Sequence, residues 1–140
     1  MAYPYKIKSS SGKGEGVFAT EKLEIGARVM RDKETMRTGL KPNEYDTQKA
    51  FDQLDDKDKQ RFMKLDEGAR SYKTKVHRIY RTNAFASGDG SYCFVYLDVS
   101  KINHSCTPNA ELVPDPVTKA VHVVAVRGID AGEEASDFCF

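Results

Sequence analysis

The sequence predicts a mainly β protein of the α+β class that carries one helical insert. Short stretches rich in β-branched and aromatic residues, bounded by turn residues, occur toward both ends of the chain, and this pattern is typical of strands. Between about residues 43 and 83, apolar residues instead repeat at spacings of three and four, which is the period of a helix. The 140 residues suffice for one domain with a single core. We therefore expect one domain over residues 1–140, with the insert inside it.

The N-terminal part predicts a short edge strand, a turn and a second strand. Residues 3–9 alternate loosely in polarity, and the turn residues 9–12 lead toward Val17, Phe18 and Ala19. Gly14 and Gly16 have no side chains, so the backbone at these positions can adopt a positive φ or be approached closely by a ligand. Spacing alone favours a hairpin turn over a ligand loop, because short glycine motifs give many false matches.

The middle of the chain predicts three helices after a turn at residues 25–26 and a strand over residues 27–30. Asp55 or Asp56 can cap the second helix and Ser71 the third. We expect the aromatic residues of this block in the core. The apolar positions that define the three helical faces are Tyr45, Phe51 and Leu54, then Phe62, Leu65 and Ala69, and finally Tyr72, Val76, Ile79 and Tyr80.

Asn83 stands where the third helix should stop, and Asn is one of the residues that tolerate the left-handed geometry of a helix C-cap. Beyond it, residues 87–90 predict a turn and residues 91–99 a strand. Residues 114–116 predict another turn, and residues 121–126 form the most apolar strand of the chain. His122 lies within that strand, and we assign it no role.

A polar run over residues 102–109, with the sequence INHSCTPN, lies between the two most apolar stretches of the C-terminal half. Its Asn and Ser side chains compete for backbone hydrogen bonds, and Pro108 lacks a donor. We therefore expect a loop and not a helix or central strand. Its side chains could simply satisfy buried backbone groups. A polar loop between strands is also where a scaffold commonly carries function.

Composition excludes several classes of protein. The 22 Lys and Arg residues against 21 Asp and Glu give a formal net charge of +1, so no global field attracts nucleic acid or a membrane surface. No apolar run approaches the roughly 20 residues of a membrane span, and residues 1–11 hold no secretory signal. The three cysteines form no CxxC pair, which favours a reducing intracellular compartment.

Three motifs in order resemble those of the SET-domain protein-lysine methyltransferases. They are GKGEGVFA at residues 12–19, KINHSCTPNA at residues 101–110 and RGIDAGEE at residues 127–134. The second is the specific one, and the likeness is closest to small fungal-type members with a helical insert. The resemblance implies the β-clip fold of that family, with short strands in small sheets and a knot-like threading of the C-terminal segment.

The resemblance also implies transfer of a methyl group from S-adenosyl-L-methionine to a lysine of a protein, histone or otherwise. Lys13, Gly14, Glu15 and Gly16 would lie along the cofactor. The helical insert would shape the substrate groove. We further expect a monomer, located in the cytoplasm or nucleus, that binds neither nucleic acid directly nor membrane.

Three further residues enter the predicted cofactor site through the resemblance. Asn83 would contact the cofactor, which competes with its interpretation as a helix cap. Asn103 would hold the amino acid end of the cofactor, and His104 would meet the adenine through its backbone. As a general base His104 is chemically possible, but the family does not use it so.

Cys106 matches a cysteine that completes a four-cysteine zinc site in family members with a cysteine-rich tail. This sequence supplies only Cys139 beyond it, whereas structural zinc takes four ligands. We therefore predict no metal and a free, buried Cys106.

The closing motif departs from the family pattern. One residue is missing after Gly132, Glu133 and Glu134, and Phe138 stands nearest to the position of the catalytic tyrosine. The sequence stops at Phe140 without the aromatic lid of the family. Two alternatives to an active methyltransferase follow: an impaired SET domain that serves as a cofactor-binding or protein-interaction module, and a truncated form of a longer enzyme.

Overall fold

The computed structural model describes residues 3–69 and 71–138, with Phe138 described by its backbone alone. Contacts within the chain divide it into two compact units. The first unit combines residues 3–33 with residues 101–138, and the second is residues 34–100. Each unit has its own sheets and is described by itself.

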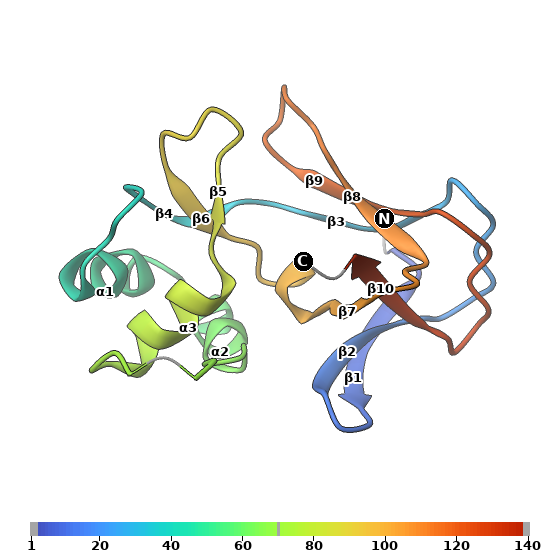
Figure 1. The fold of residues 1–140 in the computed structure, drawn as a ribbon, viewed down its shortest axis with the longest axis horizontal. Helices are drawn as coiled ribbons and strands as arrows, with labels where there is room; N and C mark the ends of the chain where they lie inside the picture. Colours follow the sequence, from blue (N-terminus) through green and yellow to red (C-terminus); the bar gives the residue numbers. More distant parts are fainter. Residues whose placement is uncertain (1–2, 70, 139–140) are drawn as a thin grey trace. The chain divides into compact units, whose positions relative to one another are not determined.

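The elements of the described part confirm the predicted fold class, since most of them are short strands in small sheets and the three α-helices follow one another within a single block of the chain (Figure 1). The strands are β1 (Tyr5–Ser10), β2 (Gly14–Ala19), β3 (Arg28–Asp32), β4 (Thr35–Thr38), β5 (Phe85–Ala86), β6 (Cys93–Val95), β7 (Asn103–Ser105), β8 (Ala110–Pro114), β9 (Val121–Ala125) and β10 (Glu134–Phe138). The helices are α1 (Glu44–Asp52), α2 (Asp56–Met63) and α3 (Lys75–Asn83), with a 3-10 helix η1 (Val99–Lys101).

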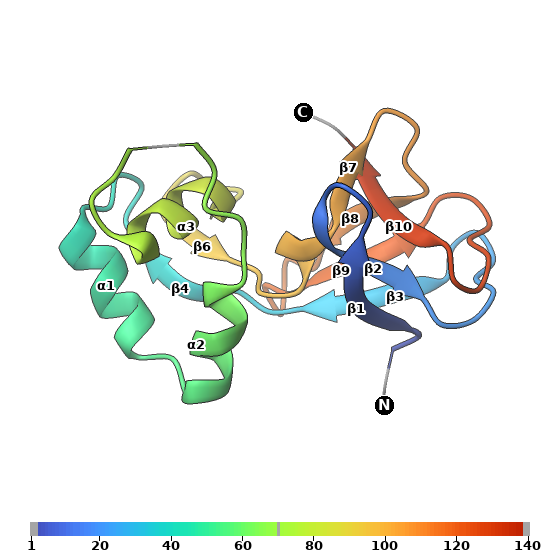
Figure 2. The ribbon, with the colours of Figure 1, turned by 90° about the horizontal axis from the view of Figure 1, so that it is seen from below.

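The first unit contains a four-stranded sheet in the order β1-β2-β10-β7 and a three-stranded sheet in the order β3-β9-β8. β1 lies at an edge, as the sequence predicts, and pairs antiparallel with β2 across the turn that follows Ser10. β10 fills the space between β2 and β7 and pairs parallel with β7 (Figure 2). The C-terminal segment therefore lies against the Asn103 motif. Knot-like threading stays a prediction.

The polar motif is not entirely a loop, contrary to our expectation. Asn103–Ser105 forms β7, whose residues Asn103 and Ser105 pair with Ser136 and Phe138 of β10. β7 is short and lies at the edge of its sheet. It ends before Pro108, so the missing donor of that proline interrupts no ladder.

The core of the first unit follows the alternation of its strands. Along β9, Val121, Val123 and Ala125 are buried while the residues between them are half-buried. Val126, which we expected inside this strand, lies beyond its end and is 38% exposed. Packing of alternate apolar residues onto one face of a sheet is the main source of its stability.

In the second unit, a capping side chain marks where each of the three α-helices begins. Asn43 caps α1 in a capping box with Asp46. Asp55, one of the two predicted candidates, caps α2. The predicted cap of the third helix was wrong: Thr74, and not Ser71, accepts the hydrogen bond from the N–H of His77. Both residue types can cap, and this start leaves Val76, Ile79 and Tyr80 on the buried face of α3.

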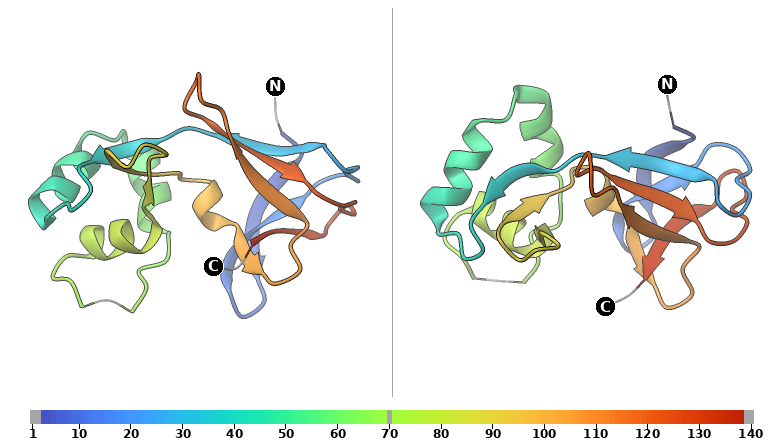
Figure 3. Two further views of the ribbon diagram at one scale, coloured as in Figure 1. Left: turned by 45° about the horizontal axis from the view of Figure 1, so that its top comes forward. Right: turned by 90° about the horizontal axis from the view of Figure 1, so that it is seen from above.

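The helices cover the three-stranded sheet of order β4-β6-β5 in the same unit (Figure 3). Their shared core confirms the prediction that most aromatic residues of this block are structural, but Tyr45 was misplaced because it is 72% exposed. Thr47 and Ala50 form the buried face of α1 instead. The core residues are Met36, Ala50, Phe62, Leu65, Val76, Ile79, Tyr80, Val95 and Leu97.

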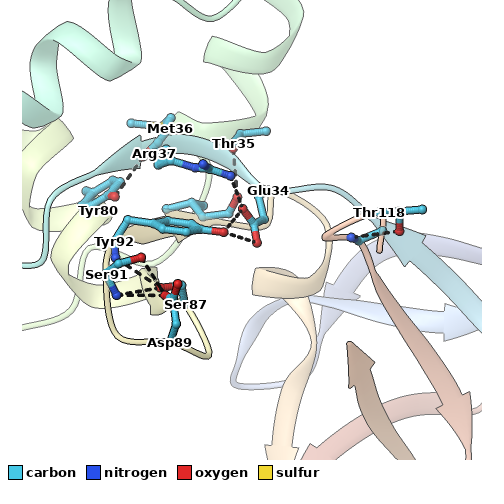
Figure 4. Close-up of polar contacts among 12 residues, drawn as sticks. Glu34, Thr35, Met36, Arg37, Tyr80, Ser87, Asp89, Ser91, Tyr92 and Thr118 are labelled. Carbon is cyan, nitrogen blue, oxygen red and sulfur yellow. Dashed lines mark hydrogen bonds and ion pairs between the residues drawn. The ribbon is translucent and has the colours of Figure 1, made fainter. Parts of the chain in front are cut away.

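Tyr80 is the largest fully buried side chain of this core. Its hydroxyl donates to Met36 O at 2.9 Å (Figure 4). The same hydroxyl lies 2.8 Å from Thr38 Oγ1. Burial raises the pKa of Tyr80 to about 12, so the hydroxyl stays a donor at neutral pH. A buried hydroxyl needs such partners because leaving it unpaired is costly. Tyr80 therefore fastens α3 to β4.

Tyr80→Phe is expected to lower the free energy of unfolding by about 1–2 kcal/mol, because the buried Met36 carbonyl loses its donor. Tyr45→Phe removes the same hydroxyl from a side chain that is 72% exposed, and it should change the stability by less than about 0.5 kcal/mol. Urea unfolding of both variants measures the difference. Equal effects would mean that the Tyr80 hydroxyl does not fasten this core.

Candidate functional site

Residues from the first and second predicted motifs meet in the first unit. The side chain of Asn103 on β7 donates through Nδ2 to Glu15 O at 3.2 Å and to Glu134 Oε2 at 2.6 Å. The acceptors are a carbonyl and a carboxylate, so the nitrogen of the Asn103 amide must face them. Its oxygen Oδ1 makes no hydrogen bond within the described part of the chain and remains available as an acceptor.

Glu134 joins the third motif to the same cluster. Its Oε1 accepts a hydrogen bond from Ser10 Oγ at 2.8 Å, while its Oε2 accepts the one from Asn103. Hydrogen bonds to a carboxylate are stronger than those between neutral groups. Side chains of β1, β7 and β10 are thereby connected across β2.

Gly16 lies against this cluster and has no room for a side chain. A Cβ at this position would stand 2.4 Å from Glu134 Oε2 and 3.0 Å from Asn103 Nδ2. Gly14 is required for another reason, since its φ is +76° while open space surrounds it. The glycine motif thus combines a close approach with a left-handed turn.

Asn109, the last residue of the polar motif, is 1% exposed and fastens β10. Its Oδ1 accepts from the N–H of Ser136 at 2.8 Å, and its Nδ2 donates to Glu134 O at 2.9 Å. Nδ2 also lies 3.3 Å from Glu133 Oε2. This buried amide provides the bonds that hold the closing motif beside the central one.

Lys13 and His104 both have exposed side chains. His104 is paired in register with Asp137 of β10, which is 8% exposed. Its main chain is therefore part of the sheet that also carries Asn103.

Asn83 belongs to the second unit, and its side chain serves that unit. Its Nδ2 donates to Ile79 O and to Asp66 O, both at 2.8 Å. The left-handed cap that we considered is wrong, because α3 continues through Asn83 and its C-cap is Ala84 in an extended conformation. The structure does not bring Asn83 to the Asn103 cluster within one unit, so its cofactor contact stays a prediction.

The prediction that Cys106 is buried was wrong. Cys106 is exposed, because it lies in the turn between β7 and β8. No group of three or more His, Cys, Asp or Glu side chains that could hold a metal ion occurs among residues 3–69 and 71–138. Cys139 lies outside the described residues. In the described part, moreover, no helix is long and apolar enough to cross a bilayer.

The second unit has a groove of about 490 Å³ between β4 and α1. Its walls mix main chain of an edge strand with polar and charged side chains of the helix. The lining residues are Thr35, Met36, Arg37, Thr38, Gly39, Asp46, Lys49, Ala50, Gln53 and Leu54.

Beside this groove, Arg37 is fixed from two sides. Its guanidinium lies 3.9 Å above the Tyr92 ring and donates to Glu34 Oε1 at 3.0 Å, while the Tyr92 hydroxyl donates to the same carboxylate (Figure 4). Cation–π contact and ion pairing together restrict a long side chain.

Comparison with known families shows to which family the chain belongs. A family model described as the SET domain matches residues 14–136, which includes the Gly16, Asn103 and Glu134 cluster. The chain belongs to the SET-domain family. The resemblance inferred from three short motifs is therefore confirmed.

One curated relative and one solved structure are similar to this chain. Histone-lysine N-methyltransferase set5 of Schizosaccharomyces pombe (strain 972 / ATCC 24843) is 28% identical over 130 residues, which is 93% of this chain and 40% of that protein. The chain thus spans about two fifths of the length of this curated relative. A solved Plasmodium falciparum chain described as a candidate histone methyltransferase has a TM-score of 0.64 at 15% identity and is similar over 100% of this chain and 96% of its own length. At that identity the likeness concerns the fold.

The motif comparison did not name three residues that belong to the hydrogen-bonded cluster around Asn103. They are Ser10, which bonds to Glu134, Lys101, which bonds to Glu15, and Glu134, which bonds to Asn103. A signal existed for Lys101, because a lysine between the apolar Val99 and Ile102 must either reach solvent or find a carboxylate.

Proposed function

We propose that this SET domain transfers a methyl group from S-adenosyl-L-methionine to the side chain of a lysine in a protein. The observation that carries the proposal is the hydrogen bonding of Asn103 to both Glu15 and Glu134, so that one residue from each predicted motif meets in a single cluster, with Gly16 lying against it. Each belongs to the part of the chain that the family model matches. Such convergence of distant motifs is expected of a binding site more than of a packing contact.

The cluster fits the amino acid end of the proposed cofactor. Asn103 Nδ2 is engaged by Glu15 and Glu134, whereas its Oδ1 makes no hydrogen bond to the described residues, and an α-ammonium group is a donor that suits it. Open space around Gly14 leaves main chain that a ligand can approach. We propose Lys13, Gly14, Glu15, Gly16, Asn83, Asn103 and His104 as the cofactor-binding residues.

S-adenosylmethionine supplies a methyl group carried on a sulfonium. The accepting lysine must be neutral, although its pKa is ordinarily about 10.4. A protein favours the neutral amine by removing it from water, and it favours the reaction by aligning the amine with the methyl group. No strong base is needed in such a site. We propose that position 138 faces the reacting amine.

The proposed substrate is a lysine-bearing segment of a protein, with histones as the first candidates because the Schizosaccharomyces pombe relative is named for them. The surface proposed to receive it is the groove between β4 and α1, which the helical insert lines on one side. A nuclear or cytoplasmic location follows from such substrates. We keep a monomeric, single-domain arrangement and the absence of direct nucleic-acid binding as proposals.

The second candidate function is a SET-like module that binds the cofactor or a partner without turnover. Phe138 favours it, because phenylalanine lacks the hydroxyl of the family tyrosine. The two candidates differ in methyl transfer and agree in cofactor binding, so separate assays distinguish them.

Asn103→Ala is expected to weaken the binding of S-adenosylmethionine by about tenfold or more, because the cofactor loses one charge-assisted hydrogen bond of about 1.5–3 kcal/mol. Titration calorimetry on the purified chain measures this. Asn43→Ala is the matched control: it removes the cap of α1, which lowers stability by about 1 kcal/mol, and it should leave the affinity unchanged. Equal affinity in Asn103→Ala would remove Asn103 from the site.

A further inference from the structure

Lys101 is a nearly buried lysine beside the proposed cofactor site. Its side chain is 6% exposed, and its Nζ lies 2.8 Å from Glu15 Oε1, with which it forms an ion pair. Lysines are seldom buried to this extent unless an opposite charge is within contact. The pair therefore explains why a charged residue is tolerated between the buried Val99 and Ile102.

Glu15 is held at two points by residues only two positions apart in the sequence. Lys101 binds its carboxylate, and Asn103 Nδ2 donates to its main-chain carbonyl at 3.2 Å. Glu15 itself stands between Gly14, whose φ is +76°, and Gly16, where a Cβ would lie 2.4 Å from Glu134 Oε2. The segment pairs with β1. Because glycines allow many backbone conformations, the contacts of Lys101 and Asn103 with Glu15 restrict it further than this pairing alone.

We propose that Lys101 is a positioning residue for the cofactor. Its ammonium group fixes Glu15, and with it the backbone of Gly14 and Gly16, in the conformation that the cofactor meets. This inference rests on the proposed function. The physical reason is preorganisation: a segment already ordered loses less conformational freedom when a ligand binds, so the affinity rises.

A purely structural ion pair is the competing explanation, and stability separates the two. Replacing a buried ion pair by an apolar side chain of similar volume is often neutral for stability. Methionine approximates the length of Lys101 without its charge. Glu15 is 39% exposed, so its carboxylate can be hydrated once the lysine is gone. Lys101→Met should therefore weaken cofactor binding while the domain stays folded.

The test is a double-mutant cycle on the purified chain. We expect Lys101→Met and Glu15→Gln each to weaken the binding of S-adenosylmethionine in calorimetry by about five- to thirtyfold. The double variant should bind no more weakly than the weaker single variant, because both changes remove the same contact. The value of kcat at saturating cofactor should change much less than KM, since a positioning residue acts on binding.

A second readout needs no cofactor. Amide hydrogen exchange in the segment of residues 11–18 should be faster in Lys101→Met than in the unchanged chain, while exchange in β8 and β9 should be equal. The matched controls are Lys22→Met and Glu24→Gln. That pair is 3.9 Å apart with side chains 69% and 80% exposed, so its removal should alter neither exchange nor affinity.

Each outcome decides the question. Binding by Lys101→Met as tight as by the unchanged chain would overturn the positioning role and leave the proposed function intact. Faster exchange throughout the first unit, with a matching loss of stability, would make the pair structural and would also overturn the inference. No binding of S-adenosylmethionine by the unchanged chain would overturn the proposed function itself, and the role of Lys101 with it.

Discussion

Asn109→Ala is expected to lower the free energy of unfolding by about 2–4 kcal/mol, because two main-chain groups of β10 lose their partners at about 1–3 kcal/mol each. Asn109 is 1% exposed, accepts from the Ser136 N–H and donates to Glu134 O. Alanine replaces neither bond, and water reaches a buried site poorly. The closing strand would therefore detach from the central motif before the rest of the first unit unfolds.

Chemical denaturation measures the loss, and Asn43→Ala gives the comparison at an exposed position. The Asn43 side chain also makes a hydrogen bond to a main-chain N–H, but solvent can replace that bond, so its loss should cost about 1 kcal/mol. Asn109→Asp keeps an acceptor for Ser136 and loses the donor to Glu134, and its cost should lie above that of the Asn43 variant. If both alanine variants cost the same, Asn109 does not anchor β10.

The strands and helices that the sequence predicted are those with a strong local period. The alternation of residues 121–125 and the apolar spacing around Val76 to Tyr80 each lie within one element, so the element can be predicted without knowing its neighbours. The predicted strand over residues 91–99 contracted to Cys93–Val95, followed by the 3-10 helix η1. Strand propensity alone does not say how many of those residues have a partner.

Elements that depend on distant partners were missed. β7 consists of Asn103, His104 and Ser105, residues with little strand propensity. They form a strand because β10, 33 residues further along the chain, pairs with them in parallel. No local pattern reveals such a pairing, since it is set by where the chain returns. The same holds for the contact between Asn103 and Glu134.

The candidate site was predicted in its residue types but not in its connections. The motifs supplied Gly16 and Asn103, whereas the bonds of Glu134 to both Ser10 and Asn103 appear only in the folded chain. Asn109 was quoted as part of the motif without a role. Its role of holding β10 is known only from its burial and its hydrogen bonds in the folded chain. Residues that hold a site together are harder to predict than residues that contact a ligand. Their hydrogen-bond partners lie far away in the sequence and come close only when the chain folds.

Phe138→Tyr is expected to raise the rate of methyl transfer by about a hundredfold, the effect of one preorganised polar group in an active site. The backbone of Phe138 pairs with Ser105, and Ser136, two positions earlier, pairs with Asn103. The main chain at position 138 thus lies beside the motif that carries the proposed cofactor contact. A hydroxyl introduced there could hold the lysine amine in line with the methyl group.

Transfer of labelled methyl groups from S-adenosylmethionine to a mixed protein substrate measures both versions. Phe18→Tyr on β2 is the control, because it adds the same hydroxyl elsewhere in the first unit and should leave the rate unchanged. Since the closing motif is one residue shorter than the family pattern, an unchanged rate in Phe138→Tyr would mean that this ring does not face the lysine. Rapid transfer by the unmodified chain, unaffected by the new hydroxyl, would show that the SET domain works without a tyrosine at position 138.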